Sequence, residues 1–233
     1  MSVASPQRKP ALTATQTDYV GLVEAMPAGA IVILSDVSWE EYDRLLHDLD
    51  EHTGIRLTYD RGKLQIMTVS LNHEKPAGFF PHLIMLLAME CGMNFISARS
   101  TTLRKQVEEK GTEPDDCYYF KNYKLIGAKK QIDLTVDPPP DLAFEVDITN
   151  PSLTEFPIYA AIGVPELWRY TNQGVHFYRL EEDDYVEINR SDLFPFLSPN
   201  DLFTFLSIGE SEGAVGMAVE FKDWIKANKE KQQ

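Results

Sequence analysis

The spacing of apolar residues predicts a chain that mixes helices with strands. Ser38 and Glu41 form a capping-box pattern. The apolar residues after them recur at helical spacing up to Gly54, which favours a helix end. Residues 55–60 and 63–69 are both rich in β-prone side chains and are separated by a two-residue turn. They are typical of a β-hairpin.

The rest of the chain alternates further helices and strands. Asn72 can cap a second helix that runs to Gly92, with Pro81 either kinking this helix or marking its start. A third helix is expected at about 153–162, ending at Gly163. Strands are expected at 94–98, 101–107, 117–120, 141–148, 166–170, 175–180 and 185–189, a short helix at 198–206, and a last helix at about 213–228.

This order of elements predicts the fold class. It indicates an α/β (α+β) domain with a central mixed β-sheet flanked by helices. We expect a flexible N-terminal lead-in over residues 1–17, a globular domain over 18–208, and a C-terminal helix with a charged tail over 209–233. The fold alone indicates no function.

The net charge limits how the protein can meet a nucleic acid. The sequence has 22 Lys and Arg against 36 Asp and Glu, a formal net charge of -14. The surface as a whole therefore repels phosphate polyanions. Any contact with DNA needs a local basic patch.

Cysteine usage and the apolar runs bear on location. Cys91 and Cys117 are the only cysteines and form no CxxC pair, which excludes a zinc ribbon and fits a reducing compartment where both stay thiols. The first residues lack the apolar core of a secretory signal, and the most apolar stretch, 83–89, is too short to cross a bilayer. We expect a cytoplasmic protein with no membrane partner.

Two acidic phrases point to a chemistry. Residues 111–120, GTEPDDCYYF, and 138–149, PPPDLAFEVDIT, each place Pro-Asp at the entrance of an apolar strand. The first phrase supplies Asp115, and the second supplies Asp141 and Glu145. Carboxylates aimed from adjacent strands can share a hard divalent cation, and Mg²⁺ takes one or two such ligands together with waters and phosphate oxygens.

Strand alternation gathers the acids of the second phrase. Asp141, Glu145 and Asp147 fall on one face, and the larger apolar residues fall on the other. Acids at alternate positions lie roughly 7 Å apart and repel one another unless a cation, a base or water lies over them. Two interpretations stay open, namely a metal site, or an ordinary turn signal followed by a solvated acidic face.

The order of these phrases resembles a known family. A Pro-Asp before a strand is followed by PDLxxEV, by a helix ending in Tyr-x-x-x-Gly-Val, and by a Glu-x-Trp strand. In this sequence the matching residues are Pro114-Asp115, Pro140-Asp141-Leu142 with Glu145-Val146, Tyr159 with Gly163-Val164, and Glu166-Leu167-Trp168. Over roughly residues 35–208 the chain resembles the Uma-type family of restriction endonucleases, which belongs to the PD-(D/E)xK nuclease superfamily.

The resemblance implies a restriction-endonuclease-like core and a hydrolytic site. Asp115 would be the motif aspartate and Glu145 the acid of the (D/E)xK element, both holding Mg²⁺, with Mn²⁺ as the alternative ion. The metal would polarise the scissile phosphate of DNA and activate water for in-line attack.

The sequence departs from the family at the lysine. The superfamily places it two residues after the acid, where Asp147 stands, and the family places it four residues before Tyr159, where Glu155 stands. A carboxylate in place of an ammonium changes the local charge by two units and should hinder cleavage. Glu155 is therefore a third candidate catalytic residue.

A basic loop and one further acid complete the candidates. Residues 121–130 contain four lysines and no acid, and a DNA-binding patch and a solvated loop are both open interpretations. Glu74, at the start of the second helix, could add a metal-side carboxylate or simply favour the helix dipole. The lysines of the loop are Lys121, Lys124, Lys129 and Lys130, and Arg99, Arg104 and Lys105 add to the basic side.

Three hypotheses follow from the sequence. The leading one is a Mg²⁺-dependent DNA endonuclease. The second is a catalytically impaired nuclease-fold protein that acts as a binding or regulatory module, with a homodimer as the expected assembly. The third is an acidic metal-binding structural protein without affinity for DNA.

Overall fold

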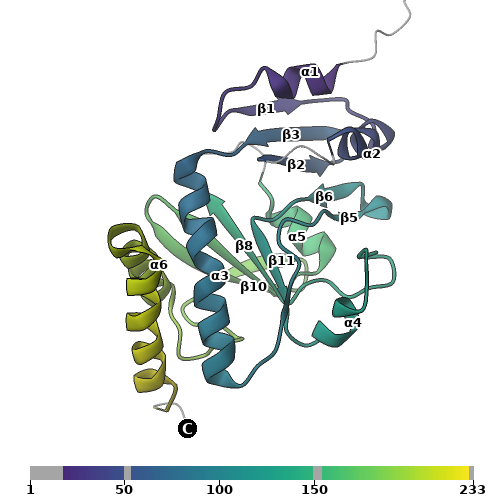
Figure 1. The fold of residues 1–233 in the computed structure, drawn as a ribbon. Helices are drawn as coiled ribbons and strands as arrows, with labels where there is room; N and C mark the ends of the chain where they lie inside the picture. The colour runs from purple at the N-terminus through teal and green to yellow at the C-terminus, as the bar shows by residue number, and fades with distance from the viewer. Residues whose placement is uncertain (1–17, 50–53, 149–153, 231–233) are drawn as a thin grey trace, which may run out of the picture.

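The computed structural model describes residues 18–49, 54–148 and 154–230 of the chain, and it contains two β-sheets with helices packed on their faces (Figure 1). The predicted lead-in over 1–17 lies outside the described residues. The predicted fold class, α/β with a central mixed sheet flanked by helices, is confirmed. Within the described ranges, no helix has the length and apolar character needed to cross a membrane.

The first sheet is antiparallel and has the strand order β1-β3-β2-β6-β5. Its predicted hairpin is confirmed as β2 and β3, and both turn residues, Arg61 and Gly62, have the positive φ that this tight turn needs. Helices α1 and α2 pack beside this sheet, and the Ser38–Glu41 capping box is present at the start of α2. The bounds are α1 Tyr19–Glu24, β1 Ile31–Leu34, α2 Trp39–Asp48, β2 Ile55–Asp60, β3 Lys63–Thr68, β5 Leu103–Lys105 and β6 Lys110–Thr112.

Alternation gives the hairpin two different faces. Leu57 pairs with Ile66, and Tyr59 pairs with Leu64, and all four side chains are buried in a core that they share with α2. The register partners on the other face are Arg56 with Met67 and Thr58 with Gln65. This second, more polar face is turned away from the α2 core.

The second sheet has the order β11-β10-β9-β8-β7-β4 and is mixed, because β8 runs parallel to β9 and antiparallel to β7. The run 141–148, predicted as a buried central strand, is β8 and lies in the interior of this sheet. The bounds are β4 Ile96–Ser97, β7 Asp116–Tyr119, β8 Leu142–Asp147, β9 Glu166–Thr171, β10 Gly174–Glu181 and β11 Asp184–Ile188.

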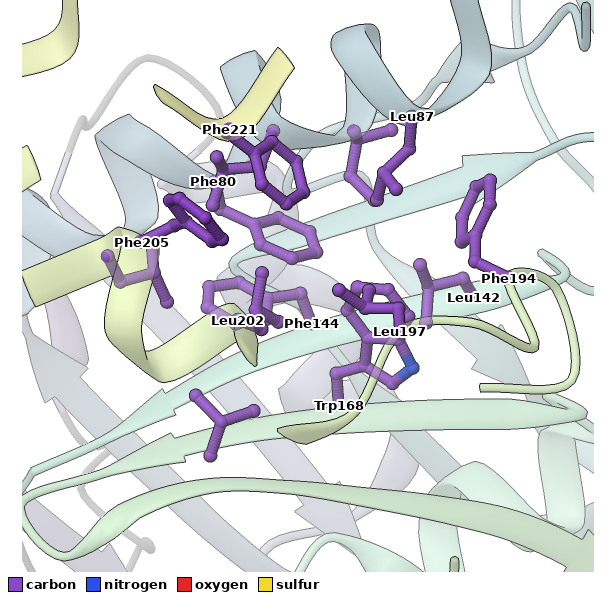
Figure 2. Close-up of a cluster of buried hydrophobic side chains, with 14 of the residues drawn as sticks. Phe80, Leu87, Leu142, Phe144, Trp168, Phe194, Leu197, Leu202, Phe205 and Phe221 are labelled. Carbon is purple, nitrogen blue, oxygen red and sulfur yellow. The ribbon is translucent and has the colours of Figure 1, made fainter. Parts of the chain in front are cut away.

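Helices α3, Leu71–Cys91, and α6, Pro199–Lys229, lie side by side on one face of the mixed sheet (Figure 1). Phe80 of α3 stacks on Phe144 of β8 with ring centroids 3.7 Å apart, and Trp168 meets Phe80 edge-on. Figure 2 shows these rings together with Phe205 and Phe221 of α6. The opposite face of β8 packs on α5, Phe156–Ile162, through a separate cluster.

Several helix boundaries differ from the predicted ones. Helix α2 ends at Asp48, well before Gly54. Helix α3 starts at Leu71 with Ser70 as its N-cap, not at Asn72, and it continues through Pro81. Its buried apolar face explains this, because packing on the sheet outweighs the hydrogen bond that a proline removes.

The two helices predicted near the C-terminus are consecutive parts of α6, which breaks at Gly213, a residue with φ 83° and ψ 170°. Met217, Phe221 and Ile225, beyond the break, lie in the same core cluster as Phe80. The domain boundaries at 208 and 209 stay a prediction. The sequence patterns did not reveal the short elements α1, β1, β6 and α4, Tyr123–Gly127.

The Phe80 stack gives a stability prediction. Phe80→Ala should lower the free energy of unfolding by about 3–5 kcal/mol, because it opens a cavity between α3 and β8. Urea unfolding followed by circular dichroism measures the change. Met89→Ala on the same helix is the matched control, since Met89 is 63% exposed, and its unfolding should stay close to that of the wild type. Equal losses in both variants would contradict the packing assigned to Phe80.

Candidate active site

A pocket lined by charged, polar and apolar side chains lies where the second face of the hairpin meets the mixed sheet. Gln65 and Met67 of β3 line one side, and Glu145 and Asp147 of β8 line another. Glu155 at the start of α5 and Arg169 of β9 also line it. The pocket therefore collects side chains from two sheets and one helix.

Asp115, directly before β7, is held on three sides. It is 5% exposed, and its Oδ2 accepts a hydrogen bond of 2.8 Å from the backbone N–H of Val146. The Nε2 atom of His73 lies 3.2 Å from the same oxygen, and Nε of Arg56 lies 3.6 Å from Oδ1. The carboxylate thus has a fixed position and a positive neighbourhood.

His73 contributes to that positive neighbourhood. It lies in the first turn of α3 and is buried. Burial opposes a charge on its ring, but the contact with Asp115 outweighs burial and raises the pKa of His73 above its usual value.

Glu145 and Glu155 meet in the interior. Glu145 is 8% exposed and accepts a hydrogen bond from the hydroxyl of Tyr159 on α5. Glu155 accepts a hydrogen bond of 3.1 Å from Thr58 of β2 and is hydrogen-bonded to Glu145. The two carboxyl groups therefore join the hairpin to the mixed sheet.

The protonation of this pair follows from its surroundings. Burial raises the pKa of Glu145 well above its usual value, and the charges of Glu155 and Asp115 raise it further. Burial and the charge of Asp115 raise the pKa of Glu155 to about 7. Near neutral pH the pair retains a proton that a bound cation would displace.

Asp147 and Arg169 form the outer edge of the site. Arg169 is the register partner of Glu145 across the parallel β8–β9 ladder, and its guanidinium pairs with the Asp147 carboxylate. The same guanidinium lies 5.5 Å from the ring centre of Phe156. The positions at which the resemblance places a lysine are thus held by an ion-paired aspartate and a buried glutamate.

The donor set suits a hard cation that also binds water. The side-chain carbonyl oxygen of Gln65 is buried and has no hydrogen-bond partner within the described ranges. In the part of the chain that the structure describes, no group of three or more His, Cys, Asp or Glu side chains is placed so that it could hold a metal ion. Mg²⁺ needs only one or two carboxylates and fills its other positions with water and phosphate oxygens, so Asp115, Glu145 and Gln65 fit it.

Asp141 and Glu74, two acids predicted as candidates, do not lie with Asp115, Glu145 and Gln65. Asp141 accepts hydrogen bonds from the backbone N–H groups of Phe120 and Lys121, so it fixes the entry to β8. Glu74 is half-exposed, 3.7 Å from Nδ1 of His73. The structure does not bring either acid to Asp115 and Glu145.

The four lysines of the loop also lie apart from Asp115 and Glu145. Lys121 is 3.6 Å from Asp141, Lys129 pairs with Asp137, and Lys124 lies over the ring of Tyr123. Lys130 is exposed. The loop lies at the end of β8 opposite to Glu145, roughly 13 Å away along the strand. Its role in binding DNA stays a prediction.

Sequence reasoning missed the site residues Arg56, Thr58, Gln65, Arg169 and His73. Side-chain alternation in β2 and β3 places Arg56, Thr58 and Gln65 on one face of the hairpin, and this shared face could have been predicted from the sequence. Nothing local to the hairpin shows that this face meets β8. The signal for Arg169 lies in a parallel strand register that pairs residues 24 apart in sequence.

The raised pKa of Glu155 predicts how stability depends on pH. Because its folded pKa lies above that of the unfolded chain, its favourable contribution is complete below pH 4.5 and is lost as pH rises through about 7. Without divalent cations, the wild type should lose about 3 kcal/mol of unfolding free energy across this range.

Glu155→Gln should lose less over the same range, because only Glu145 of the buried pair then contributes a raised pKa. Urea unfolding with EDTA at pH 5 and pH 8.5 measures the difference, and Glu108→Gln is an exposed control that should follow the wild type. Parallel pH profiles for the wild type and Glu155→Gln would contradict the burial of an acid pair.

Comparisons with known proteins show the family of the chain. One matching solved structure is described as a crystal structure of "a putative nuclease belonging to DUF820" from Anabaena variabilis, with 17% sequence identity, 64% of this chain and 90% of that chain covered, and a TM-score of 0.44. No curated protein matches the chain. The pattern of the Uma2 family, described as "Putative restriction endonuclease", matches residues 39–208, a span that contains Asp115, Glu145 and Glu155. The predicted resemblance is thereby confirmed, and the chain belongs to the Uma2 family.

Proposed function

We propose that the protein is a Mg²⁺-dependent DNA endonuclease that hydrolyses phosphodiester bonds, with Asp115 and Glu145 as metal ligands and Mn²⁺ as an alternative ion. The observation that carries this proposal is the convergence of Asp115, directly before β7, with Glu145 of the adjacent strand β8. Asp115 accepts a hydrogen bond of 2.8 Å from the backbone N–H of Val146, the residue directly after Glu145, so the two acids lie close together. Buried acids of like charge in one place favour a divalent cation.

The chain's own residues would prepare the site for catalysis. The N–H of Val146 and the ring of His73 fix Asp115, while the Tyr159 hydroxyl orients Glu145. Bound Mg²⁺ supplies a Lewis acid that polarises a phosphate and lowers the pKa of a water. Met67 and Phe156 also line the pocket, and apolar side chains beside the acids would strengthen the electrostatic interactions there by limiting contact with water.

A second function has its own support. Asp147 and Glu155 occupy both positions at which the resemblance places a lysine, and no lysine lines the pocket in the described ranges. A site without an ammonium stabilises the developing negative charge less well. The second candidate is therefore a nuclease-fold protein that binds DNA or a regulatory partner without cutting.

Cleavage of DNA tests the first proposal. Purified protein with Mg²⁺ or Mn²⁺ should convert supercoiled plasmid or a labelled duplex to shorter products. Asp115→Asn and Glu145→Gln should each lower the rate by roughly 100-fold or more, because each removes a charged metal ligand. Asp183→Asn, at an exposed position, is the matched control with unchanged rate. Absence of both metal binding and cutting in the wild type would rule the proposal out.

Glu155→Lys separates the two functions. In a working site the added ammonium should displace the cation, so cleavage and Mn²⁺ affinity should both fall at least tenfold, a loss of about 1.4 kcal/mol or more. Titration calorimetry with Mn²⁺ and a single-turnover cleavage assay measure both effects. Glu155→Gln, which removes the charge without adding one, is the control. Cleavage that arises only in the lysine variant would instead support the second function.

A further inference from the structure

We propose that Arg169 binds a phosphate oxygen of the DNA strand held at Asp115 and Glu145, and that it stabilises the negative charge that develops there. This inference rests on the proposed function. It gives Arg169 the role of the positive charge that is missing at Asp147 and Glu155, the two positions at which the resemblance places a lysine.

The register of strands β8 and β9 places Arg169 next to Glu145. Residues that pair across the parallel β8–β9 ladder direct their side chains to the same face of the sheet, and Arg169 pairs with Glu145. Both side chains line the same pocket. Of the Arg169 side chain, 31% is exposed, so a ligand in solvent can reach it.

The guanidinium is held in place and keeps free donors. Asp147 accepts from one terminal nitrogen, and the ring of Phe156 lies 5.5 Å from the guanidinium carbon. Within the described residues, no other acceptor bonds the Arg169 side chain. A guanidinium has five N–H donors in a rigid plane, so the remaining ones can bind phosphate oxygens in a bidentate manner.

The cations beside Asp115 are already engaged. Arg56 is directed at Asp115, donates to the carbonyl of Ile55, and does not line the pocket. His73 is likewise engaged with Asp115. The basic loop 121–130 lies at the far end of β8. Among the pocket-lining residues that the structure describes, Arg169 is the only base.

The pocket also shows an unsatisfied polar group. Gln65 is 3% exposed, and its carbonyl oxygen has no partner in the described ranges. A buried acceptor of this kind calls for a donor, a water or a cation. The same pocket therefore offers an acceptor and carboxylates for a hydrated cation, and a guanidinium for the phosphate that accompanies it.

The test separates binding from cutting. A short fluorescein-labelled DNA duplex is titrated by anisotropy with Ca²⁺ in place of Mg²⁺, and single-turnover cleavage is followed with Mn²⁺. Arg169→Gln should weaken duplex binding about tenfold and slow cleavage roughly 100-fold. Arg169→Lys should recover part of both, because it restores the charge without the planar fork. Mn²⁺ affinity without DNA should not weaken in either variant.

Two further variants control for folding and for general charge. The double variant Arg169→Gln with Asp147→Asn removes the ion pair without changing the net charge, and it should show the same loss of duplex binding as Arg169→Gln. Arg179→Gln removes an arginine from an exposed ion pair with Glu181 and should bind the duplex as the wild type does.

The outcomes distinguish this inference from the proposed function. Wild-type affinity for the duplex in the folded double variant would overturn the role of Arg169, even if the protein cuts DNA. Wild-type protein that binds the duplex but never cuts, with Arg169→Gln binding tenfold more weakly, would remove the endonuclease and keep the phosphate contact. A wild type that binds no duplex at all would overturn both.

Discussion

Side-chain alternation along β8 places Phe144 and Glu145 on opposite faces of the mixed sheet. Phe144 stacks on Phe80 inside the largest core cluster. Glu145, one residue later, faces the pocket and is held by the same backbone. The energy that packs the aromatic core therefore also fixes the direction of the acid, and a shift of this strand by one residue would exchange the two.

Burying carboxylates so close together is unfavourable unless other groups compensate. In this protein the compensation comes from three sources. Backbone N–H of Val146 and the hydroxyls of Tyr159 and Thr58 donate to the acids. Arg56 and His73 place positive charge beside Asp115, and a retained proton neutralises part of the Glu145–Glu155 pair. A metal ion would replace that proton, so the acids are arranged for an exchange between a proton and a cation.

Some residues of this site could be predicted from the sequence, because short motifs mark them. Others could not, because their position depends on contacts between distant segments. Asp115 belongs to one Pro-Asp phrase at a strand entrance, Glu145 follows the other, and Glu155 is found by counting back four residues from Tyr159. Lys121 and its neighbours formed an equally clear cluster, yet strand geometry carries them to the other end of β8. Arg56 and Gln65 depend on a hairpin docking against a distant strand, a contact that periodicity does not encode. Pro81 shows the same limit, because the local rule for proline is outweighed by the packing of α3 on the sheet.

The hairpin and the mixed sheet belong to separate hydrophobic clusters, one around α2 and the others around α3, α6 and α5. The pocket lies along the boundary between them, with Thr58 and Gln65 on one side and Glu145 and Arg169 on the other. Each half can therefore acquire substitutions that its own core tolerates, without disturbing the packing of the other. In a protein divided in this way, a charged residue on one side of the candidate site can be replaced during evolution and compensated by a substitution on the other side, while the fold stays the same.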